Sequence, residues 1–257
     1  MIKGLQLIPD FFDWNAYKQS PEYRHNCAIF EEIRKKQTVL CERYYNSFEE
    51  LTKDIGANTC RCEYSKGGGI FHRGYYSPSQ LDLVVGGANR GRLLKRTPKK
   101  PNYDFAYHFD EQDRLIGVYQ FDVCDDPGKM ISFEVFFYQP NNVLSLGFNT
   151  VQSPCLDRIS ECEYENGNLI CYTHSLVGFS RIVSEINMET IEYTDGLMSA
   201  FHHFISLHSG HFSHNKYMFA RDENGELSTY KSIQIGFKPK GCLEYEQKAV
   251  FQVGKRK

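Results

Sequence analysis

Four stretches of this chain share one pattern and decide the fold: FDEQDRLIGVY (109–119), YENGNLICY (164–172), YTDGLMSAF (193–201) and RDENGELSTY (221–230). Each has short polar residues, then a turn residue, then a leucine and an apolar or aromatic run. Three of them contain an Asn-Gly or Asp-Gly pair, which accepts the positive φ angles of a type I′ hairpin turn. The pattern therefore predicts a β-hairpin at each stretch.

A fifth hairpin tip is predicted at Pro140-Asn141-Asn142, between the strand-like runs 131–138 and 143–148. The tips then recur every 25 to 30 residues or so, roughly the length of two strands and a return turn. The stretch 242–253 would add an eleventh strand. Sequential pairing is the simplest topology. The predicted fold class is mainly β (α+β), with repeated antiparallel β-hairpins forming a large twisted sheet or meander and a small helical N-terminal part.

The first tip, HFDEQDRLI (108–116), resembles the YD-type hairpin repeats of bacterial Rhs-like proteins, whose units read Tyr-Asp-x-x-Gly-Arg-Leu. Asp113 stands where that repeat has glycine, and the other copies lack the arginine. The resemblance covers about half of the chain. The alternative is that hairpin turns favour the same residues for purely physical reasons.

The N-terminal part has helical signals. A helix is predicted over Pro21–Lys36, with a proline and a glutamate in its first turn and three cations in its last one. A strand is predicted over Thr38–Tyr45. Ser47 and Glu50 then form a capping box that opens a short helix ending before Gly56.

Composition shifts suggest three parts: an N-terminal helical segment (1–56), basic Gly-rich hairpins with a linker (57–101) and the β-hairpin repeat sheet (102–257). The first of the Gly-rich hairpins would lie in 60–76 and turn near its three consecutive glycines. At 257 residues, the chain is also short enough to form one compact domain.

The composition bears on compartment and partners. The net charge of the whole chain is −2, which does not favour nucleic-acid binding. No segment has the roughly 18 apolar residues of a membrane span. The N-terminus lacks the apolar region of a signal peptide. The nine cysteines are mostly scattered singly, which is typical of reduced thiols in the cytoplasm. No motif requires a cofactor.

A basic run is the clearest local anomaly in charge. Its six cations lie within eleven residues and have no acid among them: Arg90, Arg92, Lys95, Arg96, Lys99 and Lys100. Such a run on an acidic body predicts a site for an anion or an acidic partner. The alternative is a solvated hairpin and linker, with cations that protect an edge strand from unwanted pairing.

Five of the nine histidines lie between positions 202 and 214. If 201–206 is a strand, His202 and His203 point to opposite faces, and the remaining three lie on the following loop. Because histidine is the commonest metal ligand, four of them are candidate ligands: His203, His208, His211 and His214. The alternative is a polar loop with scattered histidines. The chain has no Gly-x-Ser-x-Gly elbow or P-loop.

These features favour a cytoplasmic, non-catalytic binding protein. In general style the chain is similar to bacterial immunity proteins, which are small, β-rich and acidic and which neutralise polymorphic toxins. That resemblance implies a toxin domain as the protein partner, with acidic loops that meet a basic surface of the toxin or block its active site. The lack of an apolar span predicts no membrane partner. The alternative is an enzyme that acts on a phosphate-bearing substrate or nucleic acid through the His-rich loop and the basic Gly-rich stretch. A third interpretation is a scaffold whose sheet pairs with copies of itself.

Overall fold

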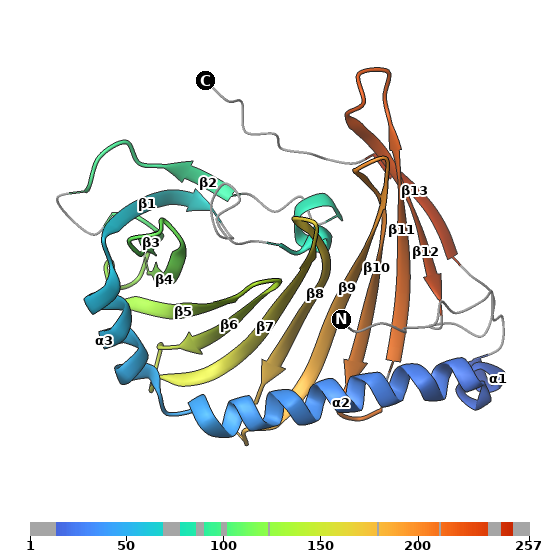
Figure 1. Cartoon of the computed structure of the whole chain (residues 1–257), viewed down its shortest axis with the longest axis horizontal. Helices are drawn as coiled ribbons and strands as arrows, with labels where there is room; N and C mark the ends of the chain where they lie inside the picture. Colours follow the sequence, from blue (N-terminus) through green and yellow to red (C-terminus); the bar gives the residue numbers. More distant parts are fainter. Residues whose placement is uncertain are drawn as a thin grey trace.

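The computed structural model describes residues 14–68, 78–85, 90–98, 102–122, 124–178, 180–210, 212–235 and 243–248. Within them, thirteen strands form one antiparallel sheet in the order β13-β12-β11-β10-β9-β8-β7-β6-β5-β4-β3-β1-β2 (Figure 1). From β3 to β13, each strand lies beside the next one in the sequence. The meander of hairpins predicted from the repeat is therefore confirmed.

Ten strands form the five predicted hairpins: β3 (Phe105–Phe109) with β4 (Leu115–Phe121), β5 (Met130–Gln139) with β6 (Asn142–Asn149), β7 (Cys155–Glu165) with β8 (Asn168–Val177), β9 (Val183–Thr194) with β10 (Leu197–Leu207), and β11 (Phe212–Arg221) with β12 (Leu227–Ile235). The eleventh strand, β13 (Leu243–Lys248), lies within the predicted stretch.

The Gly-rich region adds two strands at the other edge. β1 (Arg61–Gly68) pairs with β3 on one side and with β2 (Arg90–Leu93) on the other, so β2 is the edge strand. The second arm of the hairpin predicted in 60–76 falls on residues 69–77, which lie outside the described residues.

Two hairpin tips have the backbone that type I′ turns require. The φ angles are 51° and 81° at Asn166 and Gly167, and 52° and 75° at Asp195 and Gly196. Two consecutive positive φ angles match the right-handed twist of the strands that such a turn joins. The prediction from the Asn-Gly and Asp-Gly pairs is therefore confirmed at these two tips.

The tips near residues 112 and 224 each have a longer turn that begins with an aspartate, Asp110 in the first and Asp222 in the second. In both turns, Oδ1 of this aspartate accepts hydrogen bonds of 2.9–3.0 Å from the backbone N–H groups two and four residues later. The left-handed residue is Asp113 (φ 60°) in one tip and Gly225 (φ 77°) in the other. Type I′ is therefore wrong for the last tip, because an aspartate that caps the loop favours this turn instead.

Four helical segments are described: α1 (Trp14–Gln19), α2 (Pro21–Tyr44), α3 (Phe48–Asn58) and a single π-helical turn, η2 (Leu81–Val85). The start of α2 agrees with the prediction. Ser20 Oγ accepts a hydrogen bond of 3.1 Å from Tyr23 N, and Pro21 occupies the first turn, where a backbone N–H is not needed.

The strand predicted over Thr38–Tyr45 is wrong, because α2 continues to Tyr44. Its buried stripe runs from Phe30 through Gln37 to Cys41 at helical spacing, so packing on the sheet outweighs the β-preference of the local residues.

The next helix, α3, begins directly after Ser47, as predicted, but the capping box is not formed. Ser47 Oγ instead donates a 3.5 Å hydrogen bond to Arg43 O. The helix also continues past Gly56 to Asn58.

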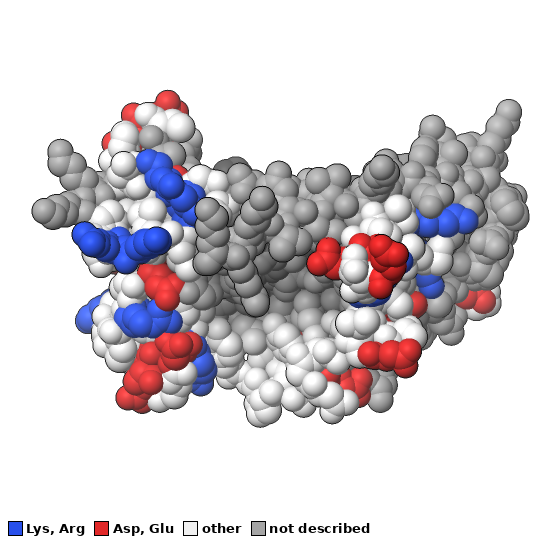
Figure 2. All heavy atoms as spheres, turned by 90° about the horizontal axis from the view of Figure 1, so that it is seen from above, with Lys and Arg blue, Asp and Glu red and all other residues white. Residues whose placement is uncertain are grey.

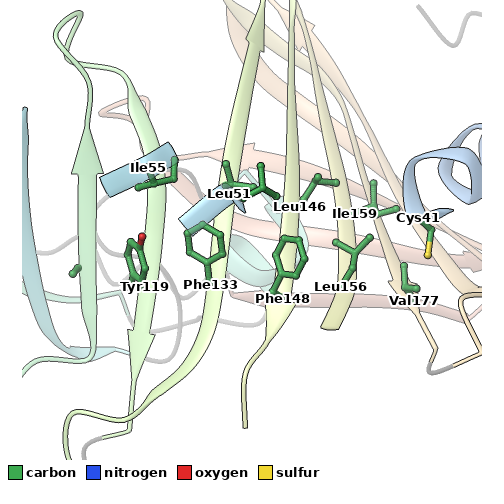
Figure 3. Packing of buried hydrophobic residues seen from close by; sticks show 12 residues of the cluster. Cys41, Leu51, Ile55, Tyr119, Phe133, Leu146, Phe148, Leu156, Ile159 and Val177 are labelled. Carbon is green, nitrogen blue, oxygen red and sulfur yellow. The ribbon is translucent and has the colours of Figure 1, made fainter. Parts of the chain in front are cut away.

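One face of the sheet, here called the helix face, packs against α2 and α3. Leu51 and Ile55 of α3 lie over an apolar row that includes Phe133, Phe148 and Ile159 (Figure 3). These three sheet side chains are each 0% exposed. Side chains alternate along β5, since Phe133 and Val135 belong to this core while Phe136 lies in a separate cluster on the other face.

Farther along the same face, α2 packs on β9 to β11. Phe30 contacts Phe204 and Phe212, with ring centroids 6.5 and 5.4 Å apart. The buried Arg34 guanidinium donates hydrogen bonds to Val183 O and, at 3.4 Å, to Ser206 Oγ. The helix α2 is thus fixed to the end of the strands where the return turns after β8 and β10 lie (Figure 1), whereas the C-terminal part of α3 lines a hollow together with the first hairpin tip.

Candidate functional site

The face opposite to the helix face carries two rows of polar side chains across adjacent strands. One row runs from β6 to β9 through the register partners Ser145, Ser160, His174 and Asn187. The other runs from β8 to β11 through Tyr172, Glu189, His203 and Asn215. Because side chains alternate along a strand, these polar groups share one face while their apolar neighbours enter the core.

Glu189 binds a segment from far away in the sequence. Its Oε1 accepts a 2.6 Å hydrogen bond from Ser79 Oγ, and its Oε2 accepts hydrogen bonds from Gln80 N at 2.5 Å and Leu81 N at 3.4 Å. Ser79 Oγ also accepts one of 3.1 Å from Asp82 N. A carboxylate on β9 therefore satisfies the first N–H groups of η2 and holds segment 78–85 against the sheet.

A cavity of about 270 Å³ lies between this segment and the sheet. Three of its lining residues come from segment 78–85 and five from β8, β9 and β10. They are Ser79, Leu81, Asp82, Tyr172, His174, Asn187, Glu189 and His203. Such a pocket, with several buried titratable groups, is the kind of place where binding sites occur.

The hydrogen bonds fix the protonation of His203. Asn187 Nδ2 donates a 2.7 Å hydrogen bond to Glu185 Oε1, which directs Asn187 Oδ1 towards His203 Nε2 at 3.2 Å. Because an amide oxygen only accepts, His203 Nε2 carries the proton. Burial lowers the pKa of His203 to about 4. At neutral pH the ring is therefore uncharged, and its Nδ1 is a lone-pair acceptor.

The residue Glu189 is 3% exposed. Burial and, to a smaller extent, nearby Asp82 raise the pKa of its carboxyl to about 7, although its three hydrogen bonds lower it. Burial also lowers the pKa of His174 to about 4, and its Nδ1 lies 3.0 Å from Ser160 Oγ. The cavity thus combines neutral rings with a carboxyl that changes charge near neutral pH.

A second buried carboxyl, Glu134, lies on the same face nearer to β5. It accepts a 2.6 Å hydrogen bond from Ser145 Oγ, and burial raises its pKa, while the Arg158 guanidinium lowers it. Arg158 in turn donates a 2.6 Å hydrogen bond to Ser132 Oγ. This carboxyl therefore has a cation close by, whereas no cation among the described residues lies beside Glu189.

The structure separates the candidate histidine ligands. His203 lines the cavity, whereas His214 lies in β11 on the helix face, with its Nε2 2.9 Å from His202 Nδ1. The prediction that His214 lies on a loop is wrong, because the turn ends earlier and β11 starts at Phe212. His208 is exposed in the turn, and His211 lies outside the described residues. Opposite faces for His202 and His203 are confirmed.

Within the part of the chain that the structure describes, no group of three or more His, Cys, Asp or Glu side chains is placed to hold a metal ion. A hydrogen-bonded chain forms on the helix face instead. His202 Nε2 lies 2.7 Å from Glu192 Oε1, and burial lowers the pKa of both His202 and His214. These histidines are therefore neutral groups of the core.

The basic run lies at the β1–β2 edge of the sheet. Arg92, Lys95 and Arg96 surround an open hollow of about 750 Å³ together with Lys66 of β1. Lys and Arg side chains gather at this end in Figure 2. Arg90 begins β2, but its side chain, like Lys99 and Lys100, lies outside the described residues. This hollow shares no lining residue with the cavity beside His203.

The hairpin tips form a third charged feature. All five tips lie at the same end of the strands, because each joins an odd-numbered strand of the meander to the next one. We call this end the acidic rim, after its seven exposed carboxylates: Glu111, Asp113, Glu165, Asp195, Asp222, Glu223 and Glu226. Acidic side chains are visible on this side in the view from above (Figure 2).

Three arginines at the tips are engaged locally. Arg114 bonds to Asp110, and Arg221 donates to the carbonyl oxygens of Gly225 and Met198. Arg61 of β1 donates hydrogen bonds of 2.9 and 2.6 Å to Asp113 Oδ1, so it offsets the charge of that carboxylate. The other six carboxylates leave the rim mainly negative.

Sequence reasoning missed Glu134, Tyr172, His174 and Glu189. The available signal was a polar residue at every second position of a strand whose other positions are apolar, as in EINME (185–189). No protein-family model and no curated protein matches this chain. No helix in the described ranges is long and apolar enough to cross a membrane.

Proposed function

We propose that this chain is a non-catalytic, cytoplasmic binding protein of the immunity type, which docks a positively charged protein partner such as a toxin domain on its acidic rim. The observation that carries the proposal is the collection of seven exposed carboxylates at one end of the meander. Carboxylates that converge on one surface attract a basic partner and speed its association.

The architecture supports this use of the rim. The helix α2 covers the return-turn end, and the exposed carboxylates at the tips belong to none of the three buried apolar clusters, so they are not needed to close a core. Short turns on a rigid sheet also hold their side chains in fixed positions, which lowers the entropy cost of binding.

The test uses a charge reversal with a matched control. Glu165→Lys with Glu223→Lys changes two exposed carboxylates on the rim. Asp125→Lys with Asp126→Lys makes the same charge change at two exposed positions in the β4–β5 turn, at the opposite end of the strands. A pull-down from lysate of the source organism, read by mass spectrometry, identifies the partner, and calorimetry with that purified partner gives the affinity.

We expect one basic protein to be retained stoichiometrically by the wild type and the control and lost by the rim variant. The affinity should also fall steeply as salt is added, because exposed charges are screened. Equal retention by both variants, or a partner whose binding ignores salt, would contradict docking on the rim.

The enzyme alternative has less support. It requires the basic stretch and the histidines to act on one phosphate-bearing substrate, yet their two cavities share no lining residue. A phosphate in the cavity beside His203 would also meet the carboxyl groups of Glu189 and Asp82, which repel it.

A further inference from the structure

The cavity under segment 78–85 has an unusual charge balance. Two of its eight described lining residues, Asp82 and Glu189, are carboxylic acids, and none of the eight is a lysine or arginine. Glu189 is 3% exposed and is compensated by hydrogen bonds from one hydroxyl and two amides, without a cation among the described residues. A buried carboxylate is costly unless a positive charge or sufficient hydrogen bonds stabilise it.

The remaining walls suit an N–H cation. His203 is 4% exposed and uses Nε2 to bond Asn187, so its Nδ1 lone pair has no partner among the described residues. Tyr172 and His174 add aromatic rings from β8. Aromatic rings attract cations through their faces, and a lone pair or carboxylate accepts N–H hydrogen bonds.

We propose that this cavity binds a small organic cation, namely a primary ammonium or guanidinium group. At about 270 Å³ it is below the usual range for drug-sized ligands, so it suits a single charged group rather than a large molecule. The group is supplied either by a free amine or by a lysine or arginine side chain of a protein. This inference stands on the cavity alone and does not depend on the acidic rim.

The site has a built-in pH dependence. Glu189 faces Ser79 and Asp82 of the segment, Tyr172 of β8, His203 of β10 and, from β11, Tyr217. The pKa of Glu189 is about 7, raised first by burial and then by Asp82. A cation binds the ionised carboxylate. Because about nine tenths of the carboxyl is ionised at pH 8 and about one tenth at pH 6, binding should be about tenfold tighter at pH 8.

The probes are methylammonium and methylguanidinium, with the neutral N-methylurea as the isosteric control. Binding to the full chain is followed through the ring signals of His174 and His203 by NMR and through calorimetry. We expect saturable binding of the two cations, no binding of N-methylurea and a preference for pH 8 over pH 6. Two further probes distinguish the two possible sources of the cation. Spermidine represents a free amine, and Nα-acetyl-lysine amide represents a lysine side chain of a protein.

Three variants complete the test. Glu189→Gln should abolish binding, and Asp82→Asn, at an exposed position, should weaken it without affecting the fold. Glu134→Gln is the matched control. It removes a carboxyl that is also buried on this face but that lies near Arg158 and outside the cavity lining, so it should bind like the wild type.

Three results would overturn the proposal: no saturable signal with either cation, equal binding of N-methylurea, or unchanged affinity in Asp82→Asn together with no pH dependence in the wild type. The last result does not require the Glu189 variant to fold. Loss of the rim-dependent partner with intact cation binding would refute only the proposed function.

Discussion

The buried carboxyl of Glu189 predicts a specific dependence of stability on pH. Its pKa is about 7 in the folded protein and has an ordinary value of 4.5. A raised carboxyl pKa means that the folded state binds the proton more tightly than the unfolded state. The folded state is therefore favoured at low pH, and it loses stability as pH rises from about 4.5 to about 7.

The size of this effect follows from the shift. One pKa unit corresponds to about 1.36 kcal/mol, so the ionisation of Glu189 should cost about 3 kcal/mol of folding free energy above pH 7. Glu189→Gln removes this titration but also weakens the hydrogen bonds to segment 78–85. The variant and the wild type must therefore be compared at several pH values, because only the change of their stability difference with pH isolates the ionisation of this carboxyl.

The assay is urea unfolding of the wild type and Glu189→Gln, followed by far-ultraviolet circular dichroism at pH 4.5, 6, 7 and 8. The free energy of unfolding of the variant minus that of the wild type should rise by about 3 kcal/mol from the lowest pH to the highest. The histidines with lowered pKa values reduce stability below pH 6.5, but they are present in both proteins and cancel in the difference. A difference that stays constant with pH would refute a buried carboxyl with a raised pKa at this position.

Four further substitutions test the packing and the turns, each by chemical denaturation. Phe133→Ala should cost about 3–5 kcal/mol, because the ring is 0% exposed beneath α3 and its removal leaves a cavity. Gly225→Ala should destabilise by about 1 kcal/mol, whereas Asp113→Gly at the same turn position should relieve strain of similar size. Gly147→Ala should cost about 1–3 kcal/mol, because the new Cβ would lie 2.8 Å from Arg158 Nε and 3.1 Å from Arg158 Cβ.

Much of the fold was predictable because the information is local. A hairpin tip such as Asn166-Gly167 specifies its own turn through two positive φ angles, and the alternation around Phe133 specifies which face enters the core. The extension of α2 to Tyr44 was not predictable in this way. It depends on burial of Gln37 and Cys41 against strands that occur far later in the sequence.

The candidate site depends even more on distant contacts. Glu189 and Ser79 are separated by 110 residues, and nothing near either one indicates that they meet. The histidine run is unusual in composition, but its members do not share one site. Strand alternation places His203 on the cavity face and His202 on the helix face. Composition identifies residue types that can bind, but register decides which of them share a site.

That register is controlled by one residue. Between Met198 and Ala200 the pairing of β10 with β9 shifts, and Ser199 is the extra residue of a β-bulge. Its Oγ donates a 3.3 Å hydrogen bond to Glu192 O. Counting from the Asp195-Gly196 tip without the bulge would place His202, rather than His203, opposite Glu189.

Deletion of Ser199 removes the extra residue, so regular pairing from the Asp195-Gly196 tip would keep Ala200 opposite Glu192 and His203 opposite Glu189. The deletion should therefore keep both faces of β10 and cost about 1 kcal/mol, like Ser199→Ala, which keeps the bulge and loses one hydrogen bond. Urea unfolding of both variants and the NMR ring signal of His203 check this. A deletion that costs about 3 kcal/mol or more and changes the His203 signal would show that Phe204, which is 0% exposed, has left the core beneath α2, and would refute Ser199 as the extra residue.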